Sequence, residues 1–218
     1  MRSSAASDVY KRQHQLSVDL RRKVALFCNV EPDAVIQSID VPSIYEVPLK
    51  MQEQKLDEIV LRKTGMEIGP RPELKPWREF LAHMQNAKDT VRIGLVGKYV
   101  ELQDAYKSIN EALFQAATYN NRKLDLQYIH SEKLTDSNVE EKLSSMDGLI
   151  IAPGFGQRGV EGKFVALKYA REHDMPTFGI CLGMQCMVIE YARDVLGYKD
   201  ANSTEMDVNT PHNLSLIH

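Results

Sequence analysis

The sequence has few cysteines and no long apolar run. Its three cysteines, Cys28, Cys181 and Cys186, form neither an even disulfide framework nor the paired spacing of a zinc site. The longest apolar runs, such as residues 149–153, are far shorter than the roughly 20 residues that span a bilayer. No N-terminal segment resembles a signal peptide. We therefore expect a protein of the reducing cytoplasm that has no membrane contact.

A strong charge of one sign is also missing. The 27 basic and 30 acidic residues give a formal net charge of -3, which provides neither a field that would attract nucleic acid nor a polybasic membrane patch. Apolar and charged fractions are those of an ordinary globular protein. A length of 218 residues fits one large domain, or one domain and part of another.

From residue 91 onward, strand-like and helix-like segments alternate. Strands are predicted at 91–97, 124–129, 148–154 and 176–180, and helices at 104–119, 137–145, 162–173 and 184–196. This alternation predicts a mostly parallel sheet flanked by helices, with the carboxyl ends of its strands along one edge. Sites in such sheets open at that edge.

The region before residue 91 is predicted to be a partial α/β domain followed by a linker. Residues 23–30 form a continuous apolar run, which is typical of a buried parallel strand. Residues 48–64 predict a helix that ends at Gly65. Prolines then mark a linker, and a further helix at 76–88 carries apolar residues at helical spacing, as expected for packing rather than for a ligand site.

A cysteine lies at the turn between the last predicted strand and the last helix. Gly179 and Gly183 flank Cys181, and small neighbours are what a sharp strand-to-helix reversal requires. The turn places the sulfur at the carboxyl edge of the sheet, above a helix N-terminus that favours thiolate. A lone cysteine is as often a packing residue, so the turn by itself leaves both interpretations open.

A second loop, at residues 153–162, contains four glycines and leaves the neighbouring strand. Such a loop lets backbone N–H groups approach a ligand closely. Alone, it fits a nucleotide-binding loop or a plain turn equally well. Together with a nucleophile turn it predicts an oxyanion hole with donors from the N–H groups of Gly154 and Leu182.

Several stretches resemble a known family. Residues 179–185, Gly-Ile-Cys-Leu-Gly-Met-Gln, resemble the nucleophile motif of class I glutamine amidotransferases. Residues 97–108, 153–162 and 201–205 narrow the resemblance to the CTP synthases, and residues 22–30 and 41–45 resemble the end of that family's synthetase domain. The resemblance implies a flavodoxin-like amidotransferase sheet preceded by a partial α/β synthetase domain.

The domain organisation expected from this resemblance is, in order, a foreign or disordered tail (1–13), the C-terminal part of a synthetase domain (14–65), a linker with a helix (66–90), an incomplete amidotransferase domain (91–212) and a foreign tail (213–218).

The resemblance implies that Cys181 attacks the side-chain amide of L-glutamine, forms a glutamyl thioester and releases ammonia for the conversion of UTP to CTP. Glutamine would be bound by Gly154, Leu182, Gly183, Met184, Gln185 and Glu205, the last of these at the α-amino group.

Nucleotide sites are implied in the same way. Lys23 would contact UTP or CTP, and Ile39, Asp40 and Val41 the adenine of ATP. The GTP activator would bind near Lys107, Arg158, Gly159 and Glu161. The resemblance further implies ATP and Mg²⁺ bound mainly by residues outside this sequence, no metal ligand and no prosthetic group here, and a homotetramer.

The departures from the family pattern are informative. An amidotransferase cysteine needs a histidine base oriented by a carboxylate, and the family's His-x-Glu motif is absent, as is its phosphate-binding loop. His130 could lie at the correct edge but has no carboxylate partner, and His173 is expected at the opposite edge. We therefore expect a segment of a longer protein, truncated at both ends, with little glutaminase turnover.

Two alternatives remain open. The first is another cysteine hydrolase or a chaperone-like protein that uses His130 as its base. The second is a regulatory module that binds glutamine or a nucleotide without turnover.

Overall fold

The computed structural model describes residues 15–214, so the tail predicted at 1–13 and residues 215–218 of the second tail lie outside the described residues. The chain divides into two compact units, unit 1 (Met1–Leu81) and unit 2 (Ala82–His218). No helix between residues 15 and 214 is long and apolar enough to cross a membrane.

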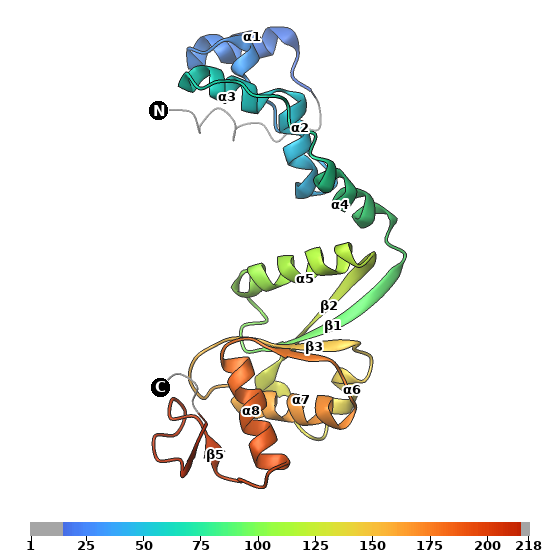
Figure 1. The fold of residues 1–218 in the computed structure, drawn as a ribbon, viewed down its shortest axis with the longest axis vertical. Helices are drawn as coiled ribbons and strands as arrows, with labels where there is room; N and C mark the ends of the chain where they lie inside the picture. Colours follow the sequence, from blue (N-terminus) through green and yellow to red (C-terminus); the bar gives the residue numbers. More distant parts are fainter. Residues whose placement is uncertain (1–14, 215–218) are drawn as a thin grey trace. The chain divides into compact units, whose positions relative to one another are not determined.

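Unit 2 contains a four-stranded sheet, which confirms the predicted parallel architecture. Its strands are β1 (Asp89–Gly97), β2 (Arg122–His130), β3 (Gly148–Ile151) and β4 (Thr177–Gly179). They run in the order β2-β1-β3-β4, and every pair is parallel (Figure 1). Gly97 pairs with His130, and Ile151 with Gly179, so the strands end together at one edge.

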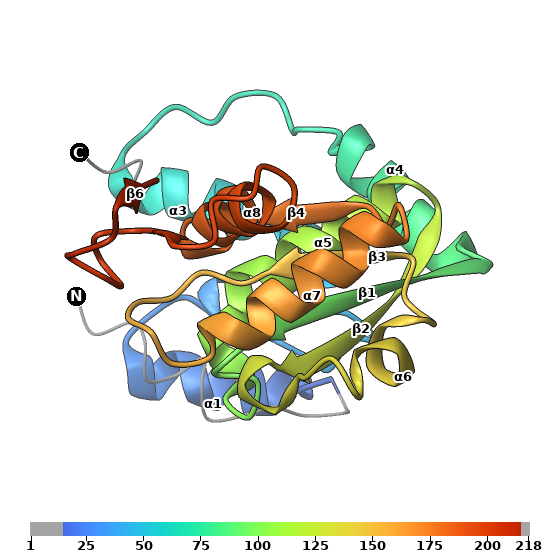
Figure 2. The same ribbon diagram turned by 90° about the horizontal axis from the view of Figure 1, so that it is seen from below.

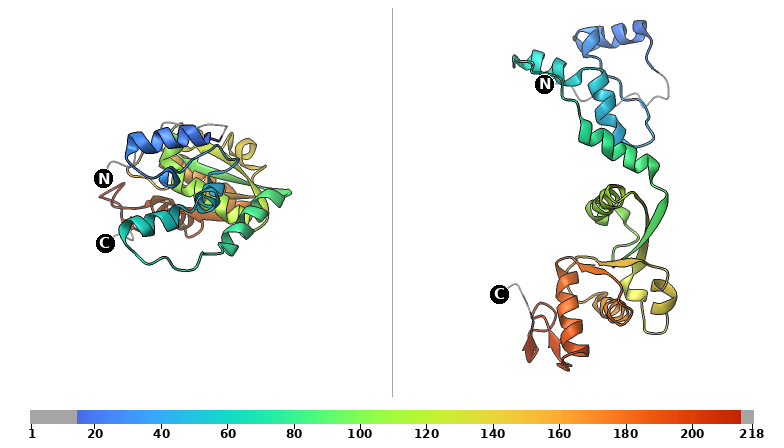
Figure 3. Two further views of the ribbon diagram at one scale, coloured as in Figure 1. Left: turned by 90° about the horizontal axis from the view of Figure 1, so that it is seen from above. Right: turned by 45° about the vertical axis from the view of Figure 1, so that its right-hand side comes forward.

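Helices cover both faces of this sheet. Helix α5 (Lys107–Tyr119) lies on one face, and α6 (Val139–Leu143), α7 (Val160–Glu172) and α8 (Leu182–Asp194) lie on the other (Figures 1 and 2). Helices α7 and α8 pack against each other, as the right-hand view of Figure 3 shows. Successive strand residues point to opposite faces: Leu95 belongs to the hydrophobic cluster that Ile109 of α5 packs against, whereas Val96 belongs to the cluster that contains Ile189 of α8.

Short elements complete unit 2. They are the 3₁₀ turns Gln103–Tyr106 and Ser131–Lys133 and the two-residue strands β5 (Ala201–Asn202) and β6 (His212–Asn213). The two short strands pair in parallel after α8, and they were not expected from the sequence.

Unit 1 corrects the prediction of a strand at 23–30. These residues lie mainly in α1 (Val18–Cys28), and the described part of unit 1 is helical rather than α/β. A parallel strand needs neighbours to satisfy its N–H and C=O groups, and residues 15–81 include no strand that could pair with it. A helix satisfies these groups internally, but it leaves Leu26 80% and Phe27 89% exposed.

The single helix predicted at 48–64 is two helices, α2 (Val47–Glu53) and α3 (Leu56–Thr64). The break occurs where Gln54 pairs with the backbone of Gln37: its Oε1 accepts the Gln37 N–H at 2.7 Å, and its Nε2 donates to the Gln37 carbonyl at 2.8 Å. Lys55 then adopts a φ of 58°. Gly65 ends α3 in the left-handed region, as predicted.

Helix α4 (Lys75–Asn86) confirms the helix predicted at 76–88, after the 3₁₀ turns Pro32–Ala34 and Ile44–Glu46 earlier in the chain. Trp77 donates its indole N–H to the carbonyl of Tyr45 at 2.8 Å, and both rings pack against Phe80. The aromatic residues of this helix therefore serve packing within unit 1.

Candidate active site

Cys181 occupies the sharp turn that the sequence predicts. It is exposed, immediately precedes α8 and has a φ of 52° and a ψ of -112°, which non-glycine residues rarely adopt. A Cβ on Gly183 would lie 2.1 Å from the Ile151 carbonyl oxygen, and one on Gly179 would lie 2.6 Å from the Gly183 carbonyl carbon. Only glycine fits at both positions, so the two glycines hold the cysteine in its strained conformation.

The glycine-rich loop reaches the same turn from β3. A Cβ on Gly154 would lie 3.8 Å from Leu182 Cδ2, so Gly154 lies beside the first residue of α8. The two predicted oxyanion donors, the N–H groups of Gly154 and Leu182, therefore belong to neighbouring segments next to Cys181.

Two lysines that were not expected from the sequence bind the start of this loop and the residue before it. Lys98 follows β1 and donates its Nζ to the Phe155 carbonyl, while Lys163 on α7 donates its Nζ to the Ala152 carbonyl at 2.7 Å. Burial lowers the pKa of Lys163. The sequence already indicates that Lys163 is buried, because it lies three residues after Val160 and so falls on the apolar face of a helix.

The predicted α-amino contact, Glu205, lies in a turn that is joined to the same loop. Gln157 donates its Nε2 to the Met206 carbonyl, and the Glu205 N–H donates to the buried Ser203 hydroxyl at 3.2 Å. The Glu205 side chain is exposed. Three segments far apart in the sequence thus converge at the Cys181 edge.

Gln185 presents an unpartnered acceptor on α8, one turn after Cys181. Gln185 is only 2% exposed, and its Oε1 has no hydrogen-bond partner among residues 15–214. An unsatisfied buried acceptor costs about 1–3 kcal/mol. A donor from a ligand would remove that cost. Of the other predicted glutamine contacts on α8, Gly183 is buried and Met184 is 41% exposed.

The residues expected near a GTP site are only partly brought together. Arg158 pairs with Glu132 at 2.5 Å, and its guanidinium lies over the ring of Tyr99. Gly159, with a φ of 76°, packs against the Ser131 hydroxyl. Two further predicted residues lie on separate helices: Glu161 in the first turn of α7, and Lys107 on α5, where it pairs with Glu111 at 2.9 Å.

No histidine hydrogen-bonds to Cys181 in the described part of the chain. His130 ends β2, three strand positions away from β4, which is about 14 Å at the usual strand spacing. Its Nδ1 accepts the Glu132 N–H at 3.3 Å. His173 stacks on Tyr169 at the far end of α7, and His212 stacks on Tyr198. His130 therefore lies at the correct edge but too far from Cys181 to act as its base.

The residues of unit 1 that are predicted to bind nucleotides do not all line the same hollow. Lys23 is exposed on α1. Ile39 lines a small polar hollow of about 170 Å³ together with Arg21 of the same helix, while Asp40 is exposed and Val41 half-buried. The structure thus places Arg21, rather than Lys23, beside Ile39.

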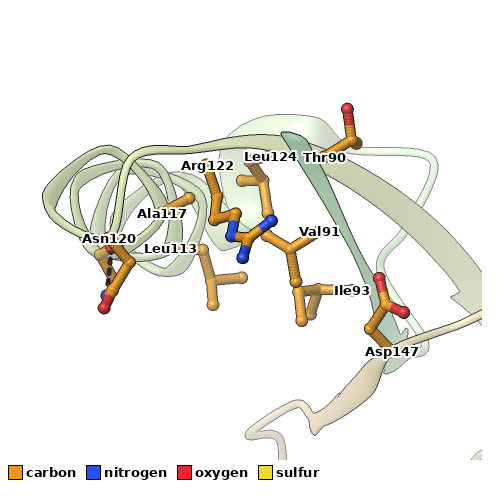
Figure 4. A pocket seen from close by; sticks show the side chains of 10 residues that line it. Thr90, Val91, Ile93, Leu113, Ala117, Asn120, Arg122, Leu124 and Asp147 are labelled. Atoms are coloured by element: carbon orange, nitrogen blue, oxygen red, sulfur yellow. Dashed lines mark hydrogen bonds between the residues drawn. The ribbon is translucent and has the colours of Figure 1, made fainter. Parts of the chain in front are cut away.

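A larger hollow of about 450 Å³ lies away from the Cys181 turn, between α5 and the starts of β1 and β2 (Figure 4). Both of its charged side chains are already paired: Arg122 with Asp89 at 2.7 Å, and Asp147 with the Arg92 N–H at 2.7 Å. The hollow is lined by Thr90, Val91, Ile93, Leu113, Ala116, Ala117, Asn120, Arg122, Leu124 and Asp147. It belongs to the amino side of the sheet and not to the cysteine site.

A parallel sheet flanked by helices, with a cysteine on a strained strand-to-helix turn beside a glycine loop at its carboxyl edge, is the architecture of an amidotransferase-like fold. Family comparison agrees: residues 101–216 match "Glutamine amidotransferase class-I", and residues 6–66 match "CTP synthase N-terminus". A solved structure, the Trypanosoma brucei CTPS glutaminase domain with bound acivicin, is similar with a TM-score of 0.53 and 40% identity, covering 56% of this chain and 48% of that one.

Curated relatives give the narrower assignment. The CTP synthase of Porphyromonas gingivalis is 65% identical over 94% of this chain, and that of Bacteroides fragilis is 63% identical over the same share. The chain therefore belongs to the class I glutamine amidotransferases and, among them, to the CTP synthases. It spans only 38% and 39% of the length of these two relatives.

Proposed function

We propose that this chain supplies the glutamine-hydrolysing part, and the end of the synthetase part, of a CTP synthase. The observation that carries the proposal is the Cys181 turn, which places a strained, exposed cysteine beside the Gly154 loop. An exposed thiol at a helix N-terminus, with backbone donors close by, is suited to attack an amide carbonyl.

In the proposed reaction, the Cys181 sulfur attacks the side-chain amide carbon of glutamine. The oxyanion accepts hydrogen bonds from the N–H groups of Gly154 and Leu182. The C–N bond then breaks, ammonia leaves with the proton given up by the thiol, and water hydrolyses the thioester to glutamate. The proton transfer needs a general base, for which no described histidine is within reach of Cys181.

Glutamine recognition is assigned to the surrounding residues. The exposed Glu205 carboxylate would pair with the α-ammonium group, and the unpartnered Gln185 Oε1 would accept a hydrogen bond from the substrate. Arg158 and Gly159, beside Glu132, remain our assignment for the GTP activator, and Glu161 and Lys107 belong to the same proposal although they lie on separate helices.

The ammonia would aminate UTP activated by ATP, with Lys23 on the pyrimidine nucleotide and Ile39, Asp40 and Val41 on the adenine. No group of three or more acidic, histidine or cysteine side chains between residues 15 and 214 forms a Mg²⁺ site, so no step here is assigned to the metal. A homotetramer and a cytoplasmic location complete the proposal.

Selective labelling of Cys181 tests the glutamine site. Acivicin is the ligand of the related Trypanosoma brucei domain, and we expect it to label Cys181 in preference to Cys28, which is also exposed, and to the buried Cys186. Peptide mass spectrometry would locate the adduct. Cys181→Ser is the control and should abolish labelling, whereas equal labelling of all three cysteines would contradict the proposal.

Ammonia release from glutamine separates binding from turnover. We expect the 218-residue chain to release ammonia far more slowly than an ordinary enzyme, because Cys181 has no described base. Turnover at an ordinary enzyme rate would show that a base is present after all. Acivicin labelling without turnover fits both a segment of CTP synthase and a regulatory module, and the gene sequence beyond Leu214 distinguishes the two.

A further inference from the structure

We propose that Lys98 and Lys163 are positioning residues that hold the Gly154 segment beside Cys181, an inference that rests on the proposed function. The two lysines come from different elements: Lys98 follows β1, and Lys163 lies in α7. Their Nζ atoms bind the carbonyl groups of Phe155 and Ala152, one on each side of Pro153-Gly154.

Both lysines are buried, and each makes this bond in place of water. Lys163 is 1% exposed and Lys98 is 8% exposed. Burial lowers the pKa of Lys163, and the positive charge of Lys98 lowers it further, whereas Cys186 and Cys181 act in the opposite direction. Placing two cationic side chains close together in the interior is costly. An apolar side chain at this position of α7 would avoid that cost. The two lysines must therefore make a local interaction that compensates for their burial.

The loop supplies that reason, because little else holds its middle. Phe155 is 79% exposed, and a Cβ on Gly156 would meet no atom within 4 Å. Glycines add backbone freedom that folding must remove. The described contacts therefore hold residues 153–156 mainly through the carbonyls before and after Gly154, whereas the rest of the loop is held by Gln157 on Met206 and by Arg158 on Glu132.

Fixing these two carbonyls restricts the two peptide groups between them, the first of which carries the Gly154 N–H. The Pro153 ring sets φ at that residue, Lys163 orients the preceding peptide plane, and Lys98 orients the plane that follows Phe155. The Gly154 N–H is then directed in advance, rather than ordered only when substrate binds. Preorganised donors of this kind are what stabilises a developing oxyanion.

Two electrophiles separate loop position from thiol reactivity. With acivicin, the Cys181 sulfur adds to the chlorine-bearing carbon of a C=N bond, negative charge develops on the nitrogen, and chloride leaves as the new C–S bond remains. Iodoacetamide is attacked by direct displacement of iodide, with no such charge to stabilise. Only the first reaction depends on oxyanion-type donors.

For Lys163→Met we expect acivicin labelling of Cys181 to slow by about tenfold to a hundredfold, less than the loss of a whole donor. The rate of iodoacetamide labelling should change far less than the rate of acivicin labelling. Lys168→Met is the matched control, since Lys168 lies on the same helix with its side chain 46% exposed, and both rates should be unaffected. Lys98→Met should repeat the selective loss, and it carries the test if Lys163→Met does not fold.

An unchanged acivicin rate in both variants would overturn the positioning role. An equal slowing with both reagents would also overturn it, because the lysines would then act on the thiol or on the fold as a whole. If acivicin fails to label the unsubstituted chain, the proposed function falls together with this inference. Labelling of the unsubstituted chain without loss in the variants refutes the inference alone.

Discussion

Similar apolar stretches are buried in one unit of this chain and exposed in the other. In unit 2, Leu95, Ile151 and Ile189 are completely buried between the sheet and its helices. In unit 1, the equally apolar stretch around Leu26 and Phe27 forms a helix and leaves both side chains on the surface. The difference shows that an apolar run is buried only where neighbouring elements supply a matching face.

The reason is a difference in available partners. Unit 2 contains parallel strands and the helices that connect them, so each strand finds hydrogen-bond partners and cover on both faces. The described part of unit 1 contains no strand that could pair with residues 23–30. Stability should therefore be unequal between the units, and three predictions test this.

The largest effect is expected from core truncation. Ile189→Ala should lower the free energy of unfolding of unit 2 by about 2–5 kcal/mol, because the cavity lies in a closed core. Phe27→Ala should change that of unit 1 by less than about 0.5 kcal/mol, because the ring is exposed. Denaturant titrations can follow both units: fluorescence of Trp77, the single tryptophan, reports unit 1, and accessibility of the buried Cys186 reports unit 2.

A larger loss for Phe27→Ala than for Ile189→Ala would reverse the comparison. It would mean that the exposed ring of Phe27 is covered in solution.

A smaller effect is expected in unit 2 at alkaline pH. Burial raises the pKa of the Cys186 thiol from its usual value near 9 to about 11. Between these two pH values the unfolded chain loses the thiol proton while the folded chain keeps it, so stability falls as pH rises. Two pH units correspond to about 2–3 kcal/mol.

The measurement is the difference in unfolding free energy between the unsubstituted chain and Cys186→Ala, across pH 9 to 11. Lys163, whose lowered pKa makes stability rise with pH, is present in both chains and interacts electrostatically with Cys186. A difference that does not change with pH would contradict the burial of the thiol.

The smallest effect is expected from ion pairs. Arg171 on α7 binds Glu190 on α8 through two nitrogens, at 2.8 Å and 3.0 Å, and Glu190 is 5% exposed. Arg171→Gln leaves a mostly buried carboxylate without its partner and should lower the stability of unit 2 by about 1–2 kcal/mol.

The control is Arg62→Gln in unit 1. Arg62 pairs with Asp33 at 2.5 Å, but both side chains are more than half exposed, so we expect no measurable change. Urea midpoints for the two variants give the comparison. Equal losses would show that exposure does not decide the strength of these pairs.

The Cys181 turn and the glycine-rich loop could be predicted from the sequence, because each depends on residues that are close together in the chain. The turn at Cys181 follows from a strand pattern, a helix pattern and the small residues Gly179 and Gly183 between them. The alternation from residue 91 likewise predicted every strand of the main sheet to within a few residues. Periodicity reports which face of an element is apolar, and that is enough wherever the partner elements are present in the same unit.

Other features depended on contacts between residues distant in sequence. The helical state of residues 23–30 depends on the absence of a pairing strand from the described part of unit 1, and the break before α3 depends on Gln54 reaching back to Gln37. The distance between His130 and Cys181 depends on strand order, which places β2 and β4 at opposite ends of the sheet.

The amino-acid sequence by itself determined the cysteine turn, the glycine loop and the parallel sheet, because spacing and backbone freedom are properties of short stretches of chain. Tertiary structure alone decided that Lys98 and Lys163 bind the carbonyls on both sides of Pro153-Gly154, and that Gln185, one turn after Cys181, keeps a side-chain oxygen with no partner among residues 15–214. These are properties of a buried position, and burial is created only when separate elements pack together.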